Sequence, residues 1–127
     1  KESLRVFFTA IIMNHFLRNG DGHLKNYGVL YEYDYEDARL APIYDVITTT
    51  MYIKNDIPAL KLDDGKLWWK EKTLKAFATK SCRLSNSDYE EAVQICMDAI
   101  KKTKMEIDSY EAKNDEIREF LEKLKMC

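Results

Sequence analysis

Apolar side chains recur at helical spacing in the first part of the chain. Residues 3–18 carry large apolar residues on most sides of a helix: Leu4, Phe7, Phe8, Ile11, Ile12 and Phe16. A helix that is apolar nearly all round is usually covered by other elements in the middle of a domain. The Asn19-Gly20 pair that follows is a turn signal, so we expect the helix to end there.

The pattern changes after a polar loop over residues 19–26. The run YGVLYEY (27–33) is rich in strand-forming residues, and a second short apolar run (38–42) follows the acidic turn DYED. Two short apolar runs joined by a polar turn predict a β-hairpin, and we expect the acidic turn to be its solvated tip. Residues 46–66 contain threonines, a proline and an Asp-Gly pair, which indicates irregular structure.

The second half of the chain has a helical pattern. Residues 67–82 are amphipathic, and Ser87 and Glu90 have the S-x-x-E spacing of a capping box. We therefore expect a long helix that begins at this capping box and continues to about residue 110. Its apolar face carries Tyr89, Val93, Cys96, Met97 and Ile100.

A last helix is predicted after the turn residues Asn114 and Asp115. Its apolar side chains are Ile117, Phe120, Leu121 and Leu124. The order of elements is thus helix, loop, hairpin, irregular segment and three helices. This order predicts a mainly α fold with a small β-hairpin, an α+β protein with a single domain over residues 1–127.

Composition and charge limit the possible functions. The chain has 127 residues, 46% of them apolar, which is typical of one globular domain. Its 20 basic and 22 acidic residues nearly balance, whereas dedicated nucleic-acid binders usually have a strong basic excess. We expect no direct nucleic-acid contact. The sequence contains neither an apolar run of about 18 residues nor a signal-peptide pattern, so we expect a cytoplasmic protein without membrane contact.

The cysteines give no evidence of a disulfide framework or a zinc knuckle. Cys82, Cys96 and Cys127 are odd in number and have no C-x-x-C spacing. Cys96 lies on an apolar helical face and is interpreted as a small core residue. The sequence begins at Lys1 almost directly with a helical pattern, which we interpret as the start of a segment of a longer protein.

Chemically active side chains gather in the polar loop and at the end of the predicted hairpin. The loop carries Asp21, His23, Lys25 and Asn26, and the hairpin leads to Asp45 in the apolar frame PIYDV. A hairpin returns the chain close to its origin, so Asp45 can lie near Asn26. Phosphoryl transfer uses such a set, because one carboxylate orients the attacking hydroxyl while amide and carboxylate oxygens hold Mg²⁺ on the nucleotide phosphates.

Two runs in this region resemble the HipA family of bacterial toxin kinases. They are NGDGHLKN (19–26) and LAPIYDV (40–46), which match the family's N-x-D-x-H-x-K-N catalytic loop and P-x-Y-D metal motif. The spacing Asp21-x-His23-x-x-Asn26 is also similar to the catalytic loop of phosphoinositide-kinase-like enzymes. The likeness is clearest up to residue 46 and weaker over 59–66.

The resemblance implies the C-terminal lobe of a HipA-like, protein-kinase-like fold. Its parts are the catalytic loop (19–26), the hairpin (27–42), the metal motif (42–46) and a helical part (67–127). They imply a serine/threonine kinase that uses ATP as substrate and Mg²⁺ as cofactor.

The same resemblance gives each residue of the site a role. It implies that Asp21 is the catalytic aspartate and that Asn26 and Asp45 bind the Mg²⁺ of the nucleotide. His23 braces the loop or contacts the γ-phosphate, and Lys25 is a weaker candidate for phosphate contact.

The resemblance also implies partners. Family members phosphorylate proteins such as aminoacyl-tRNA synthetases and work with a DNA-binding antitoxin. An N-terminal kinase lobe or subunit must grip ATP, because the chain has four glycines and no G-x-G-x-x-G run. We therefore expect the 127 residues alone not to transfer phosphate measurably.

Plainer interpretations of the same residues remain. A turn whose Asn, Gly and Asp were chosen for turn geometry is the plainer interpretation of the loop, but it leaves His23, Lys25 and Asn26 unexplained. His15 is expected to be a core or helix-surface histidine, and a transition-metal site of His15, His23 and Asp21 matches no familiar spacing.

Two other functions compete with the kinase. One is a non-catalytic or split C-terminal lobe that docks a partner subunit. The other is a metal-dependent phosphohydrolase built on the same acids. Trp68 and Trp69 are a possible partner-binding patch, although we expect a buried pair there.

Overall fold

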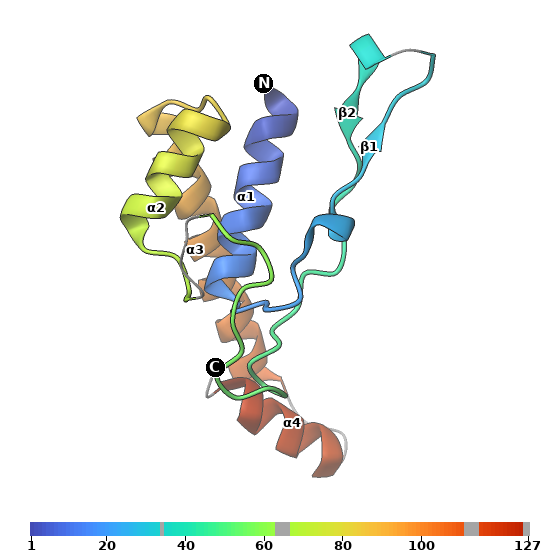
Figure 1. Cartoon of the computed structure of the whole chain (residues 1–127). Coiled ribbons are helices and arrows are strands. Elements are labelled where there is room, and N and C mark those ends of the chain that lie inside the picture. The colour runs from blue at the N-terminus through green and yellow to red at the C-terminus, as the bar shows by residue number, and fades with distance from the viewer. Residues whose placement is uncertain (34, 63–66, 111–114, 126–127) are drawn as a thin grey trace.

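The chain folds into a helical body from which a hairpin projects (Figure 1). The computed structural model describes residues 1–33, 35–62, 67–110 and 115–125. The described elements in chain order are α1 (Glu2–Phe16), a 3₁₀ turn (Leu24–Asn26), β1 (Val29–Leu30), a second 3₁₀ turn (Tyr35–Asp37), β2 (Arg39–Leu40), α2 (Glu71–Ala76), a π-helical turn (Phe77–Ser81), α3 (Asn86–Ser109) and α4 (Asp115–Lys125). This content is mainly helical with one antiparallel hairpin, which confirms the α+β expectation.

The core lies where α1, α2, the π-helical turn and α3 meet. Its largest fully buried side chains are Phe8, Ile11, Ile12 and Cys96. The Phe8 ring lies 6.4 Å from Phe77 and 5.9 Å from Tyr89, so one α1 side chain joins α1 to the two neighbouring helical layers. The burial of Cys96 agrees with its interpretation as a core residue, and its thiol points to the Thr9 carbonyl at 3.5 Å.

The first turns of α1 are less covered than the sequence predicts. Leu4, which belongs to the apolar pattern of the helix that was expected to be covered, is 39% exposed, and the neighbouring Val6 is 43% exposed. Val6 borders an open groove that lies between α1, α3 and the segment around Ile43 and Val46, described below.

The helix predicted over residues 67–82 begins later, at Glu71, and ends as a π-helical turn. The residues just before α2, including Trp68 and Trp69, are held out of the helix by tertiary contacts. The Trp68 indole N–H donates to the Asp56 carbonyl at 2.9 Å, and the Trp69 ring stacks on His15. Trp69 is buried and Trp68 half-buried, close to the expected buried pair.

The predicted capping box is shifted by two residues. Ser85, not Ser87, is the N-cap of α3, and its hydroxyl accepts the Asp88 N–H at 3.1 Å. The Asp88 carboxylate in turn accepts the Ser85 N–H at 2.9 Å. Ser85 has the extended backbone that an N-cap requires, whereas Ser87 and Glu90 already lie inside the helix. Asp88 thus occupies the N3 position at which a capping box usually has Glu or Gln.

The hairpin is shorter than the sequence predicts. Val29 pairs with Leu40 and Leu30 with Arg39, so each strand has only two residues instead of five to seven. The hairpin contacts the body where the Leu40 N–H donates to the Ser3 hydroxyl at 3.2 Å. Its described tip residues are exposed, which agrees with a solvated tip: Tyr33, Tyr35, Glu36 and Asp37.

The remaining expectations concern the irregular segment and the last helix. The described parts of residues 46–66 contain no helix or strand, as predicted. Ile117 and Leu121 of α4 are half-buried and Phe120 is 43% exposed. The expected turn residues Asp64, Gly65 and Asn114 and the Leu124 side chain lie outside the described part of the chain. Among the described helices, none has both the length and the apolar character needed to cross a membrane.

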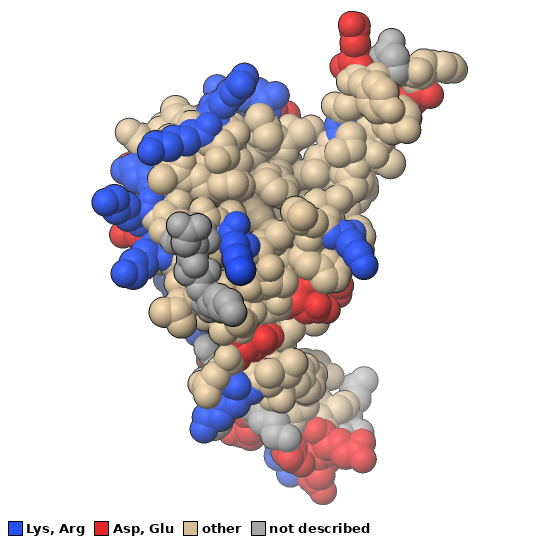
Figure 2. Space-filling view, in the orientation of Figure 1, with Lys and Arg blue, Asp and Glu red and all other residues tan. Residues whose placement is uncertain are grey.

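The near balance of charge hides an uneven distribution. Figure 2 shows Lys and Arg gathered over the α2 side of the body and acidic residues at the hairpin tip. The exposed basic residues in and around α2 are Lys70, Lys72, Lys75 and Lys80. In the view of Figure 1, α2 and the loop that follows α1 lie on opposite sides of α1, so this basic face is separate from the region of the candidate site.

Candidate functional site

The candidate site begins where α1 ends. Arg18 has a left-handed backbone (φ 54°), which turns the chain out of the helix, and the Asn19 N–H closes the turn on the Asn14 carbonyl at 2.9 Å. The chain then runs through Gly20–His23 into a 3₁₀ turn, Leu24–Asn26. The expected catalytic loop therefore starts from a fixed point on the central helix of the body.

Asn26 folds back onto the loop that carries it. Its side-chain Oδ1 accepts the His23 N–H at 2.9 Å, and its own N–H donates to the His23 carbonyl at 3.0 Å. The side chain is 5% exposed. A short, polar residue that bonds a neighbouring backbone in this way is well suited to a tight turn.

Asn26 and Asp45 meet, although 19 positions separate them in the sequence. The Asn26 Nδ2 donates to the Asp45 Oδ2 at 2.8 Å. Asp45 has a left-handed backbone (φ 59°), a conformation that Asp and Asn adopt more readily than most other residues. The hairpin thus brings the second acid back to the loop.

Asp21 lies beside His23 at the exposed edge of the loop. The Asp21 carboxylate is exposed, and its Oδ1 lies 4.0 Å from the His23 Nε2. The His23 N–H also donates to the Asp21 carbonyl at 2.8 Å, which ties the two residues through the main chain. Asp21 is therefore open to a substrate while its imidazole neighbour is held close.

Lys25 is connected to the site through its main chain. Its side chain is exposed, and its carbonyl accepts the Tyr44 hydroxyl at 2.7 Å. Tyr44 belongs to the PIYDV frame, so this bond is a second tie between the loop and the segment that carries Asp45. Sequence reasoning assigned no role to Tyr44, although its fixed place beside Asp45 in the motif was a usable signal.

The donor chemistry of Asn26 and Asp45 fits Mg²⁺. Both side chains offer hard oxygens, and Mg²⁺ takes few protein ligands because waters and substrate phosphates fill its other positions. The Asn26 amide presents Nδ2 to Asp45, so ligation by both residues requires the amide to turn its oxygen that way. In the described part of the chain, no three His, Cys, Asp or Glu side chains converge on one point, and the alternative transition-metal site gains no support.

The site lies within a family match. A model described as the HipA-like C-terminal domain matches residues 1–106. The chain belongs to this family. No curated protein and no solved structure gives a match. The matched range includes Asp21, Asn26 and Asp45 and most of α3, while α4 follows it.

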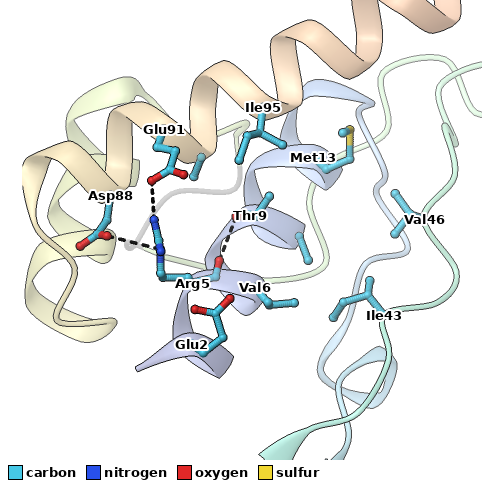
Figure 3. A pocket seen from close by; sticks show the side chains of 12 residues that line it. Glu2, Arg5, Val6, Thr9, Met13, Ile43, Val46, Asp88, Glu91 and Ile95 are labelled. Atoms are coloured by element: carbon cyan, nitrogen blue, oxygen red, sulfur yellow. Dashed lines mark hydrogen bonds and ion pairs between the residues drawn. The ribbon is translucent and has the colours of Figure 1, made fainter.

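The HipA-like domain also contains a groove beside the PIYDV segment, residues 42–46 (Figure 3). It has a volume of about 440 Å³ and lies between α1, α3 and the segment around Ile43 and Val46. One end is polar, because Arg5 bridges Asp88 at 3.3 Å and also pairs with Glu91. Hydrogen bonds from Ser85 hold the pKa of Asp88 below its usual value, and the charges of Lys1 and Arg5 add to this effect. None of the candidate site residues lines the groove.

Thr49 supports the loop from beneath and was missed by sequence reasoning. Its buried hydroxyl accepts the Gly20 N–H at 2.8 Å, lies 3.0 Å from the Arg18 carbonyl and also contacts the Asp56 carboxylate. A Cβ added at Gly20 would lie 2.0 Å from the Asp56 Oδ2, so only glycine fits there without displacing that carboxylate. The threonine run gave no sign of these partners.

His15 lies apart from the candidate site, in the core, as expected. It is 9% exposed and stacks on Trp69 with ring centroids 5.8 Å apart. Burial, and to a lesser extent the positive charge of Arg18, lower the pKa of His15 from 6.5 to about 4. The imidazole is therefore neutral at pH 7 and contributes to packing.

Proposed function

We propose that this HipA-like domain is the C-terminal catalytic lobe of a serine/threonine protein kinase of a toxin–antitoxin module. In this proposal the parent protein transfers the γ-phosphate of ATP to a protein hydroxyl. The contact between Asn26 and Asp45 is the observation that carries the proposal, because it joins two oxygen-bearing side chains at the foot of a loop that exposes Asp21.

Each residue has a defined task in the proposed reaction. Asp21 orients the attacking hydroxyl and accepts its proton, which requires an exposed carboxylate. Asn26 and Asp45 would hold the Mg²⁺ of the nucleotide, and the bound ion would supply charge neutralisation at the phosphates. His23 braces Asp21 or contacts the γ-phosphate, and Lys25 contacts phosphate.

The proposal requires a second part that binds ATP. The four glycines form no phosphate-covering run, so an N-terminal lobe or subunit supplies that grip. In this proposal the hairpin contacts that part, because a two-stranded hairpin is marginally stable alone and this one exposes Val29 (61%), Leu30 (45%) and Tyr31 (55%). We further propose a cytoplasmic setting, a protein substrate such as an aminoacyl-tRNA synthetase, and an antitoxin that makes the DNA contacts.

The same exposed hairpin supports a second candidate function. In that alternative the domain is a non-catalytic or split lobe whose task is to bind a partner subunit. The two functions differ in what the acids do, since a binding module has no need of a cation at Asn26 and Asp45.

The deciding experiment measures cation binding by the 127-residue chain. Mn²⁺ is used in place of Mg²⁺, since both ions prefer carboxylate and carbonyl oxygens. Mn²⁺ is paramagnetic and broadens the NMR signals of nearby amides, so even weak binding can be detected. We expect Asp45→Asn to weaken Mn²⁺ binding at least about tenfold, as loss of a ligand should cost no less than loss of an outer-shell partner. Asn keeps the left-handed backbone accessible, so the fold at position 45 is preserved.

The matched control is Asp98→Asn, which removes an exposed carboxylate from α3 and should leave the Mn²⁺ affinity unchanged. In a protein that also contains the ATP-binding part, Asp21→Ala should reduce autophosphorylation at least about a hundredfold. Equal Mn²⁺ binding by the wild type and Asp45→Asn, together with full activity of Asp21→Ala, would contradict the kinase proposal and favour the binding module.

A further inference from the structure

Asn19 has a hydrogen-bonding arrangement that no role assigned so far explains. Its amide is 3% exposed and uses all of its polar atoms. The oxygen accepts the Asp21 N–H at 3.1 Å, and the nitrogen donates to the Asn14 Oδ1 at 2.7 Å and to the Asp45 carbonyl at 3.0 Å. An amide has two N–H donors and one carbonyl oxygen, so each of these groups has a partner.

The other side of this network is anchored in α1. Asn14 is 5% exposed, lies near the end of that helix, and donates from its Nδ2 to the Tyr27 hydroxyl at 3.0 Å. The Asn19 main chain is bonded to Asn14 as well, through its N–H at 2.9 Å. Asn19 therefore has little freedom to move relative to the helical body.

The hydrogen bond from the Asn19 side chain to the Asp45 carbonyl stabilises a left-handed backbone conformation that is unfavourable for an aspartate. A residue other than glycine is strained in the left-handed region and persists there where surrounding contacts hold it. The Asn19 Nδ2 holds the Asp45 carbonyl in that conformation (φ 59°), and the same conformation directs the Asp45 side chain to Asn26. Without the hydrogen bond from Asn19, the Asp45 carboxylate would no longer be held in its orientation towards Asn26.

We propose that Asn19 is a positioning residue that clamps the backbones of Asp21 and Asp45 to the end of α1. It contacts neither substrate nor cation, and it fixes the separation of the two acids that do. The inference rests on the proposed function for what those acids accomplish, while the clamp itself is a property of the backbone.

The test compares Asn19→Ser with Tyr27→Phe in the 127-residue chain. Both substitutions remove hydrogen bonds from one buried network, but only the first removes the bonds to Asp21 and Asp45. Amide hydrogen exchange at Asp21 measures the clamp directly, because the Asp21 N–H is hydrogen-bonded to the Asn19 side chain. We expect the Asp21 N–H to exchange about tenfold faster in Asn19→Ser, the factor that corresponds to one lost hydrogen bond, and at an unchanged rate in Tyr27→Phe.

Paramagnetic broadening by Mn²⁺ supplies the second readout. Asn19→Ser should bind Mn²⁺ about tenfold more weakly, whereas Tyr27→Phe should bind it as the wild type does even though both variants are less stable. An unchanged Asp21 exchange rate in Asn19→Ser, or equal losses of Mn²⁺ affinity in both variants, would overturn the clamp.

Failure of the clamp and failure of the kinase proposal give different results. If the wild type shows no Mn²⁺ broadening near residues 26 and 45, the metal role fails, and the exchange rate of Asp21 still decides the clamp. If Asn19→Ser does not fold, Asn14→Ser replaces it, because it removes one acceptor of the Asn19 amide. Faster exchange at Asp21 would then support the clamp, and unchanged exchange would refute it.

Discussion

The helical body and the site segment, residues 17–62, are held in place by different forces. The body is ordered by apolar side chains such as Phe8 and Ile12, which are completely buried between helices. Within the site segment the described strands have only two residues each, and its buried side chains are mostly polar, namely Asn19, Asn26 and Thr49, with Pro58 as an apolar exception. Apolar packing is non-directional, whereas a hydrogen bond weakens steeply outside a narrow range of distance and angle.

This difference suggests a division of tasks. Packing decides where α1 lies, and directed hydrogen bonds to the end of α1 decide where the acids lie. A change in the body should therefore alter the free energy of unfolding of the whole domain. A change in the site segment should alter local geometry at a smaller cost in stability.

The largest expected effect comes from the centre of the body. Ile12→Ala removes a fully buried side chain, and we expect it to lower the free energy of unfolding by about 3 kcal/mol through lost burial and a new cavity. The control is Val6→Ala on the same helix, which should cost less than about 1 kcal/mol because Val6 is 43% exposed. Urea denaturation measures both, and similar losses would show that the groove end of α1 is covered in solution.

An intermediate effect is expected from the buried histidine. The folded chain resists protonation of His15 down to a pKa of about 4, while the unfolded chain takes up the proton near 6.5. Stability should therefore fall as the pH drops from about 6.5 to 4, by on the order of 2 kcal/mol after allowance for partial solvent access. His15→Phe keeps an aromatic ring against Trp69 and cannot titrate. Its stability curve should lack this slope, and a curve parallel to the wild type would assign the slope to other groups.

The smallest expected effect tests the start of α3. Ser85→Ala removes the N-cap hydroxyl that accepts the Asp88 N–H, and we expect a loss of about 1 kcal/mol. Ser87→Ala, two residues further on, should cost less than about 0.5 kcal/mol. Thermal unfolding of the two variants distinguishes them, and the reverse order would restore the capping box that the sequence pattern suggested.

Periodicity predicted those parts of the fold that depend on apolar packing. The apolar spacing of α1 and the apolar face around Cys96 predicted the central helices and much of the core, although Leu4 and Met97 of these patterns are 39% and 54% exposed. The turn signals around the hairpin were sufficient to predict that Asp45 returns towards Asn26, and the structure brings these two residues into contact.

Specific hydrogen bonds could not be read in the same way. The Asn19 amide meets the Asp45 carbonyl 26 positions later, and the Gly20 N–H meets Thr49 29 positions later. No periodic pattern relates such pairs, because each depends on the course of an irregular segment. The capping residue was misplaced for a related reason: the S-x-x-E spacing favoured Ser87, whereas the course of the chain into α3 makes Ser85 the N-cap, with Asp88 in the place of the glutamate.

The close approach at Gly20 has a consequence for protein engineering. The main chain of the loop at Gly20 lies against the Asp56 carboxylate, which Thr49 and the Ile57 N–H hold in place. The two segments therefore have complementary shapes. A graft of the NGDGHLKN loop into another scaffold would have to bring residues 49–57 with it. The transferable unit is thus a pair of segments, and the eight-residue motif that can be recognised in the sequence is only one of them.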